Sequence, residues 1–155
     1  MGPNEVQAVL VLAVEEILET MYFQTVLASA EGTAPPNADS DGPSLTAEVR
    51  FQGNRSGRFR VGVPIKLARL LGAAFLGREE AEVSDSDAAE VVCELANMIC
   101  GSVLSRLERQ ATFEITHPVL IPPEQGVSFE GDSASRWFDL EDGMLAVSLE
   151  LQWVV

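Results

Sequence analysis

The segment Ser84–Glu108, SDSDAAEVVCELANMICGSVLSRLE, is the longest stretch of the 155-residue chain with an uninterrupted helical period. Steps of three and four residues divide it into two stripes, because an α-helix places such neighbours on one face. The apolar stripe reads Ala88, Val91, Val92, Leu95, Met98, Ile99 and Val103. The polar stripe reads Asp87, Glu90, Glu94, Asn97, Gly101, Ser105 and Glu108. We therefore expect an amphipathic helix that begins with a capping box formed by Ser84 and Asp87.

Two further segments have helical periodicity. Residues 5–29 carry an apolar face opposite Glu15, Glu16 and Glu19, which predicts a first long helix. Residues 65–76 predict a shorter helix, with Pro64 as its first residue and Gly77 as its end.

The remaining apolar segments alternate with a period of two, which is typical of half-buried β-strands. Residues 45–52 and 58–63 predict a hairpin with one solvent-exposed face, joined by a turn at residues 53–57. After the central helix we expect strands at 111–116, 127–129, 135–140 and 145–153, with a connection at 119–125 and a turn at Asp142-Gly143.

This order of elements predicts an α+β fold in which two long helices pack on a largely antiparallel sheet. A chain of this length fits a single domain, residues 1–155. Residues 31–44 are rich in Pro, Gly, Asp and Ser, and we expect a flexible loop insert there. Residues 14–21 align with residues 92–99, which is a short match that weakly indicates a pseudo-repeat.

Composition excludes several classes of protein. The net charge of −14 and the scattered basic residues argue against a nucleic-acid partner, since phosphate contacts need clustered Lys and Arg. The apolar run Ala8–Val14 is too short to span a bilayer and no signal peptide is evident, so we expect a cytoplasmic protein without a membrane partner.

Metal and disulfide sites are also not expected. A single histidine, His117, cannot form a His-based metal site or a His-centred triad without much help, and Asp39 and Asp41 do not follow a calcium-loop pattern. Cys93 and Cys100 would lie about 10 Å apart on one helix, which is too far for a disulfide.

The middle of the polar stripe carries the candidate chemistry. Asn97 has poor helix propensity in mid-helix, so its amide either bonds something locally or faces a partner. Glu94 lies one turn before Asn97 on the same face, and Gly101 one turn after it leaves room for another backbone. Glu90 and Glu94 could also serve acid–base chemistry if buried, and the alternative throughout is a plain solvated stripe.

The run Glu94-Leu95-Ala96-Asn97-Met98-Ile99-Cys100-Gly101, followed by Thr116-His117-Pro118, resembles the signature of the CheC/CheX/FliY phosphatases of bacterial chemotaxis. A single Glu-x-x-Asn motif is closest to the CheX branch, and the order of elements agrees with that branch over nearly the whole chain. The chain departs from the family pattern at Glu90, at Ser102-Val103 and at Glu19, which stands where a two-site member would carry Asn.

The resemblance implies a CheC/CheX-like fold and dephosphorylation of a phosphorylated, CheY-like receiver domain of a response regulator. By the same resemblance, Asn97 would position the attacking water and Glu94 would anchor the receiver, while Glu90 and Gly101 would contact it. The chain itself would bind no cofactor, and Mg²⁺ would belong to the receiver. Members of the CheX branch are often dimers, which implies a possible homodimer.

Two other interpretations remain open. The protein could be a non-catalytic module that binds a receiver or acts as a switch-type scaffold. It could also be a self-associating domain that pairs through its final strand, Leu145–Val155, if that strand lies at a sheet edge.

Overall fold

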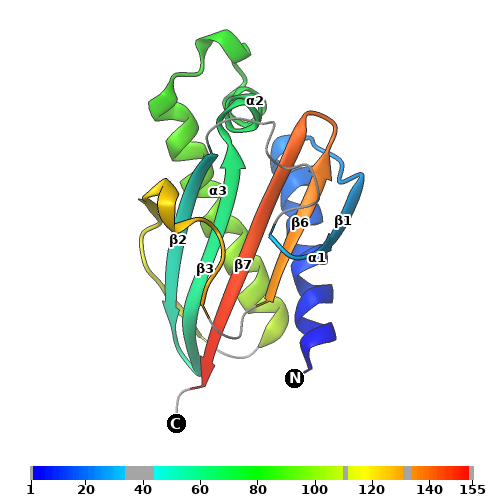
Figure 1. Ribbon diagram of the computed structural model, residues 1–155, viewed down its shortest axis with the longest axis vertical. Helices are drawn as coiled ribbons and strands as arrows, with labels where there is room; N and C mark the ends of the chain where they lie inside the picture. The colour runs from blue at the N-terminus through cyan, green and yellow to red at the C-terminus, as the bar shows by residue number, and fades with distance from the viewer. Residues whose placement is uncertain (1, 34–43, 110–111, 131–133, 154–155) are drawn as a thin grey trace.

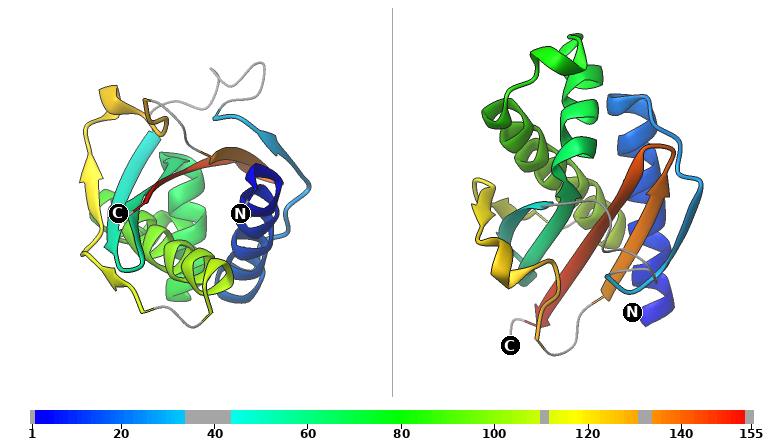
Figure 2. Two further views of the ribbon diagram at one scale, coloured as in Figure 1. Left: turned by 90° about the horizontal axis from the view of Figure 1, so that it is seen from below. Right: turned by 45° about the horizontal axis from the view of Figure 1, so that its top comes forward.

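The computed structural model describes residues 2–33, 44–109, 112–130 and 134–153. The helices are α1 (Pro3–Tyr22), α2 (Ile65–Leu76) and α3 (Asp85–Leu107), with the 3-10 turns η2 (Glu80–Glu82) and η3 (Pro123–Gln125). The strands are β1 (Ala28–Glu31), β2 (Ser44–Gln52), β3 (Arg55–Pro64), β4 (Glu114–Ile115), β5 (Val119–Ile121), β6 (Ala134–Leu140) and β7 (Gly143–Trp153). Figures 1 and 2 show the three helices on the same side of one sheet. The predicted α+β class is confirmed.

The sheet has the order β1-β6-β7-β3-β2-β4 within the described residues, and β5 also pairs with β2. Every one of these pairs is antiparallel. Two hairpins, β2–β3 and β6–β7, meet where β3 pairs with β7. Strand β7 therefore lies inside the sheet, and the expectation that the final strand could pair across an edge is wrong.

Helix α3 packs as its two stripes predict. The Ser84 hydroxyl accepts a hydrogen bond from the Asp87 backbone N–H at 3.0 Å, and the Asp87 carboxylate accepts one from the Ser84 N–H at 3.1 Å. The backbone hydrogen bond from Ser84 also lowers the pKa of Asp87. Six of the seven residues of the apolar stripe are buried, and Met98 packs partly buried against the same core.

Helix α3 is long and apolar enough to be a membrane-span candidate by composition alone, among the residues described. Half of its most apolar stretch is buried inside the protein, as in the core helices of soluble proteins.

Helix α1 is shorter than the sequence predicts. It ends at Tyr22, and the following Phe23 adopts the left-handed conformation at φ 58°. Residues 28–31 then form β1, which pairs with β6. The predicted helix to residue 29 is wrong because pairing with β6 decides this segment, and no Gly or Pro marks the helix end.

Three local expectations are corrected. Pro64 is the last residue of β3 and precedes helix α2, whereas Gly77 ends α2 in the left-handed conformation as expected. Residues 119–121 form a strand on β2, and residues 127–129 form none. Strand β4 contains only Glu114 and Ile115 of the predicted 111–116. Of the predicted insert, residues 34–43 lie outside the described part of the chain, as does Ala111.

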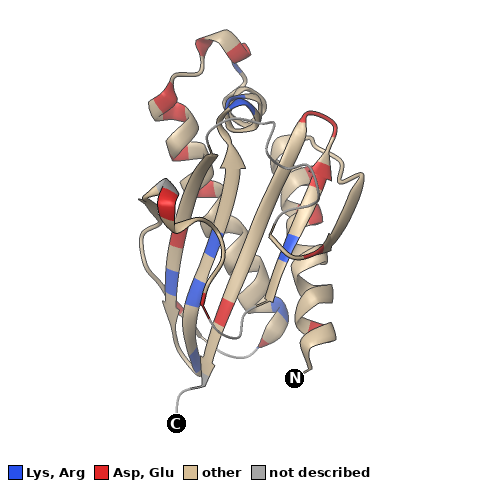
Figure 3. Cartoon of the chain, viewed as in Figure 1, with Lys and Arg blue, Asp and Glu red and all other residues tan. Residues whose placement is uncertain are grey.

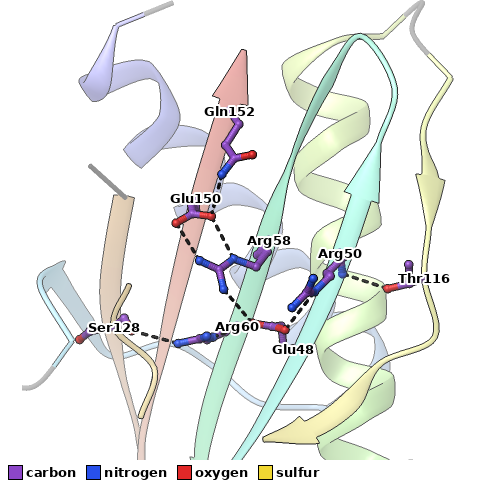
Figure 4. A network of polar contacts seen from close by, with 8 residues as sticks. All are labelled: Glu48, Arg50, Arg58, Arg60, Thr116, Ser128, Glu150 and Gln152. Carbon is purple, nitrogen blue, oxygen red and sulfur yellow. Dashed lines mark hydrogen bonds and ion pairs between the residues drawn. The ribbon is translucent and has the colours of Figure 1, made fainter. Parts of the chain in front are cut away.

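The hairpin pattern predicts that the face of the sheet opposite the helices is exposed to solvent. In the structure this face is partly covered. Glu48 and Arg60 expose only 6% and 7% of their surface, and they form an ion pair at 2.9 Å. Residues 127–129 cover this face: Ser128 accepts a hydrogen bond from Arg60, and the Phe129 ring lies 4.2 Å from the Arg60 guanidinium carbon. Figure 4 shows that Arg58 extends the network to Glu150, while Arg50 joins Glu48 to Thr116.

This network generates a stability prediction. Glu48→Gln removes the carboxylate that faces three arginines, and it leaves the buried Arg60 guanidinium without its counter-charge. We expect the free energy of unfolding to fall by about 3 kcal/mol in urea denaturation. Glu16→Gln is the matched control, because the Glu16–Arg106 pair is largely exposed and is expected to contribute less than about 1 kcal/mol. Equal effects of the two substitutions would contradict the role assigned to Glu48.

Candidate functional site

The polar stripe of α3 faces solvent in its middle turns. Glu90 and Glu94 are exposed, while Asn97 and Gly101 are half-buried on the same face. The structure thus brings together the four residues that the sequence singles out. They lie on a rigid element, since the other side of α3 contributes nine buried residues to the core.

The two ends of the stripe are occupied by contacts within the fold. Asp87 belongs to the capping box and lies 3.6 Å from Arg78, and Glu108 pairs with Arg55 at 2.9 Å. The Ser105 hydroxyl donates to the carbonyl of Ser102 at 3.1 Å. These residues have structural roles, so the candidate site narrows to the turns between Glu90 and Gly101.

Asn97 has no side-chain hydrogen bond to any described residue. Its presence in mid-helix costs about 0.5 kcal/mol relative to alanine, and a local bond is the usual compensation. Asn97 makes no such local bond within the described chain. The remaining explanation from the sequence is that the amide faces a partner.

Glu94 and Glu90 likewise form no ion pair or hydrogen bond with the described residues. The two carboxylates lie at positions i and i+4, where like charges repel modestly. Apart from the adjoining backbone of α3, a Cβ atom added at Gly101 would meet no atom of the described chain within 4 Å, so this end of the site is open. A backbone from another molecule can therefore approach the helix beside Asn97.

Tyr22 underlies this site, and the sequence analysis did not single it out. Its side chain is fully buried, and its ring stacks on Phe75 of α2 with a centroid separation of 5.2 Å. The hydroxyl has no hydrogen-bond partner among the described residues, and such an orphan costs about 1–3 kcal/mol. Burial, and then the charge of Glu94, raise the pKa of Tyr22. The sequence contains one feature that could have indicated Tyr22. It is the chain's single tyrosine, at a position where Phe would fill the core equally well.

The surface around the site is acidic with an apolar margin. Glu16 and Glu19 are exposed on α1, and Figure 3 shows acidic residues along both α1 and α3. Phe23 is 75% exposed just after α1, and Met21 and Leu76 are also exposed near that end. Such a surface suits a partner that offers basic groups beside apolar ones.

Metal-ligand clusters and disulfides do not occur in the described ranges. Among residues 2–33, 44–109, 112–130 and 134–153, no three His, Cys, Asp or Glu side chains could together hold a metal ion. Cys93 is half-buried and Cys100 is buried, and burial raises the pKa of the Cys100 thiol to about 12. Both cysteines are free, as expected.

Solved structures of bacterial chemotaxis proteins have a similar fold. A chain of the CheX–CheY–BeF3–Mg²⁺ complex from Borrelia burgdorferi superposes with a TM-score of 0.72 at 20% identity, over 94% of this chain and 97% of that one. CheX from Desulfovibrio desulfuricans gives 0.70 at 23% identity, over 96% and 99%. FliY from Thermotoga maritima is more distant, at 0.54 and 15% identity, over 96% and 90%.

None of the curated protein sequences compared with the chain matches it significantly. A family model described as "Chemotaxis phosphatase CheX" matches residues 45–140, which span the sheet from β2 to β6 together with α2 and α3. The matched part therefore includes the whole candidate site on α3, and the chain belongs to the CheX family of chemotaxis phosphatases.

Proposed function

We propose that the protein accelerates hydrolysis of the aspartyl phosphate of a CheY-like receiver domain, and that Glu94 and Asn97 carry out this function. The observation that carries the proposal is the pair itself, an exposed carboxylate and a half-buried amide on one face of α3. Asn97 has no bonding partner among the described residues, Glu94 lies one turn away, and both stand on the helix that the family match covers.

In this proposal Asn97 positions the water that attacks. The amide oxygen accepts a hydrogen bond from the water, whose oxygen then forms a bond to phosphorus. The bond from phosphorus to the receiver's aspartate oxygen breaks, which releases inorganic phosphate and a free carboxylate. Phosphoryl transfer depends mainly on positioning and electrostatics, so one well-placed amide can contribute much of the acceleration.

Glu94 anchors the receiver by pairing with its active-site lysine. Glu90 extends the acidic contact, and Gly101 provides the clearance that lets the receiver's backbone approach α3. The Mg²⁺ ion belongs to the receiver and neutralises charge on the phosphoryl group, while this chain brings no cofactor of its own. The Borrelia CheX relative, solved with CheY, BeF3 and Mg²⁺, supports a partner of this kind.

The cellular setting follows from the partner. Receiver domains of the CheY type act in the cytoplasm, so we place this protein there as well. Its net charge of −14 favours encounter with a receiver surface that presents lysines, since complementary charge raises association rates.

A receiver-binding module without catalysis is the second candidate. The departures from the family pattern at Glu90 and Ser102-Val103 favour it. Such a module would bind the phosphorylated receiver through the same face and leave its dephosphorylation rate unchanged. Measuring binding and phosphate release on the same sample separates the two candidates.

Asn97→Ala is the first test of the mechanism. We expect the maximal rate of receiver dephosphorylation to fall by about a hundredfold or more, because the attacking water loses its orienting group. The free energy of unfolding should stay level or rise by about 0.5 kcal/mol, because alanine is the better helix former. Phosphate release from a Mg²⁺-loaded receiver phosphorylated with a small-molecule donor measures the first quantity.

Ser105→Ala is the matched control for Asn97→Ala, because Ser105 lies two turns further along the same stripe. Its rate should match that of the wild type. An unchanged rate in Asn97→Ala, with wild-type activity present, would contradict the role of Asn97.

Glu94→Gln tests the anchoring role separately. We expect KM for the phosphorylated receiver to rise about tenfold with a smaller change in kcat, since a charge pair with the partner is lost. The salt dependence of KM should also weaken, because screening acts on that pair. Glu82→Gln removes an exposed carboxylate from η2 and should leave both parameters unchanged. A Glu94→Gln enzyme that retains the wild-type KM would exclude the anchor.

A homodimer is a separate proposal. Ile115, Val119 and Leu120 are exposed on β4 and β5, at one border of the sheet in the described chain. Such borders can pair with a second copy. We expect sedimentation velocity at micromolar concentration to show a dimer, and Val119→Lys to shift it to monomer. A monomeric wild type at high concentration would contradict the proposal.

A further inference from the structure

Two complementary groups at the candidate site lack hydrogen-bond partners among the described residues. The Tyr22 hydroxyl is a buried donor, and the Glu94 carboxylate is an exposed acceptor. A phenylalanine at position 22 would fill the same space and keep the stack on Phe75, so the hydroxyl needs another explanation. Buried polar groups are nearly always bonded, which makes an orphan of this kind informative.

The packing of the helices brings the two groups into one neighbourhood. Figures 1 and 2 show α1 and α3 running in roughly opposite directions, and Glu16 near the middle of α1 pairs with Arg106 at the far end of α3. The end of α1 therefore lies toward the first half of α3.

Helix α2 limits the position of Tyr22 from the other side. A Cβ atom at Gly72 would lie 3.3 Å from Val91 Cγ2, which places α2 against α3 at that point. Helices α2 and α3 run in opposite directions, because Arg78 just beyond the end of α2 lies 3.6 Å from Asp87 in the first turn of α3. Phe75, the ring on which Tyr22 stacks, therefore lies toward the turns of α3 that precede Glu94, whereas the Glu16–Arg106 pair places the end of α1 toward the middle of α3. Tyr22 thus lies where the three helices meet, between the first turns and the middle of α3, and Glu94 stands within that part of α3. The charge of Glu94 raises the pKa of Tyr22, after burial.

We propose that the Tyr22 hydroxyl donates a hydrogen bond to the Glu94 carboxylate and holds it in the orientation that meets the receiver. Tyr22 is then a positioning residue, and it contacts neither the receiver nor the phosphoryl group. The pair itself is a property of this chain alone, whereas its use in catalysis rests on the proposed function.

In this proposal the Glu94 side chain rotates to meet the hydroxyl, because Glu94 is exposed whereas the hydroxyl is buried in the core. Burial keeps the phenol protonated at neutral pH, so it remains a donor. A glutamate held in this way loses less rotamer freedom when the receiver docks, and the saving appears as tighter binding.

The first test is spectroscopic and needs no partner. The chain has a single tyrosine, so labelling with ¹³Cζ-tyrosine gives one resonance that reports on Tyr22. At pH 7, Glu94→Gln should move this resonance, because the charged acceptor of the hydroxyl is removed. Glu90→Gln, which removes the same charge one turn earlier on the exposed face, should leave it in place. An unmoved resonance in Glu94→Gln, or equal shifts in both variants, overturns the pair.

The second test is kinetic. Tyr22→Phe retains the ring and its stack on Phe75 and removes only the hydroxyl, so the variant should stay folded. We expect KM for the phosphorylated receiver to rise about three- to tenfold with kcat within about twofold, the size of one hydrogen bond to a charged group. In a Glu94→Gln background the same substitution should have no further effect, since the two residues act as one unit.

The two tests separate the possible failures. If the wild-type protein has no phosphatase activity, the proposed function is wrong. The spectroscopic result still decides whether Tyr22 and Glu94 are hydrogen-bonded. An active wild type in which Tyr22→Phe has an unchanged KM overturns the positioning role. A Tyr22→Phe effect of equal size in the Glu94→Gln background also overturns it, because Tyr22 would then act through another group.

Discussion

The packing of the apolar stripe of α3 against the sheet and the two other helices determines which residues this protein offers to a partner. Val92, Leu95 and Ile99 are fully buried, so the helix cannot rotate about its axis without exposing them. That constraint fixes Glu94 and Asn97 outward. The capping box at Ser84 fixes where the helix begins, and thus how far along the molecule these side chains lie.

A site of this design is half of a catalytic centre. The described part of α3 offers a carboxylate, an amide and open space beside Gly101. The amide can orient a water, and the carboxylate can bind a partner. In the proposed reaction, the phosphoryl group, the metal and the lysine all come from the receiver. The chain therefore needs a rigid helix and clearance more than a deep pocket, and a helix packed on an antiparallel sheet provides both.

The sequence predicted features with a local physical cause and missed those set by tertiary pairing. The two stripes of α3, its capping box and the Gly77 helix end follow from spacing and residue type, and all three are confirmed. The end of α1 at Tyr22 and strand β5 depend on partners distant in the chain, so no local signal marks them. The hairpin's outer face looked exposed because nothing in its own pattern shows that Phe129 covers Arg60. In the site, the exposed residues were predictable from α3 alone, whereas Tyr22 could be placed only once three helices were seen to meet.

The central claim is that the exposed turns of α3 between Glu90 and Gly101 meet the phosphorylation site of a receiver. The most direct measurement is an amide chemical-shift map of this protein during titration with a beryllofluoride-activated, Mg²⁺-bound receiver. The account predicts that the largest changes fall on residues 90–101 and on the neighbouring end of α1, and that they are absent with the unactivated receiver at equal concentration. Changes centred on the outer sheet face around Glu48 and Arg60, with residues 90–101 unmoved, would contradict it.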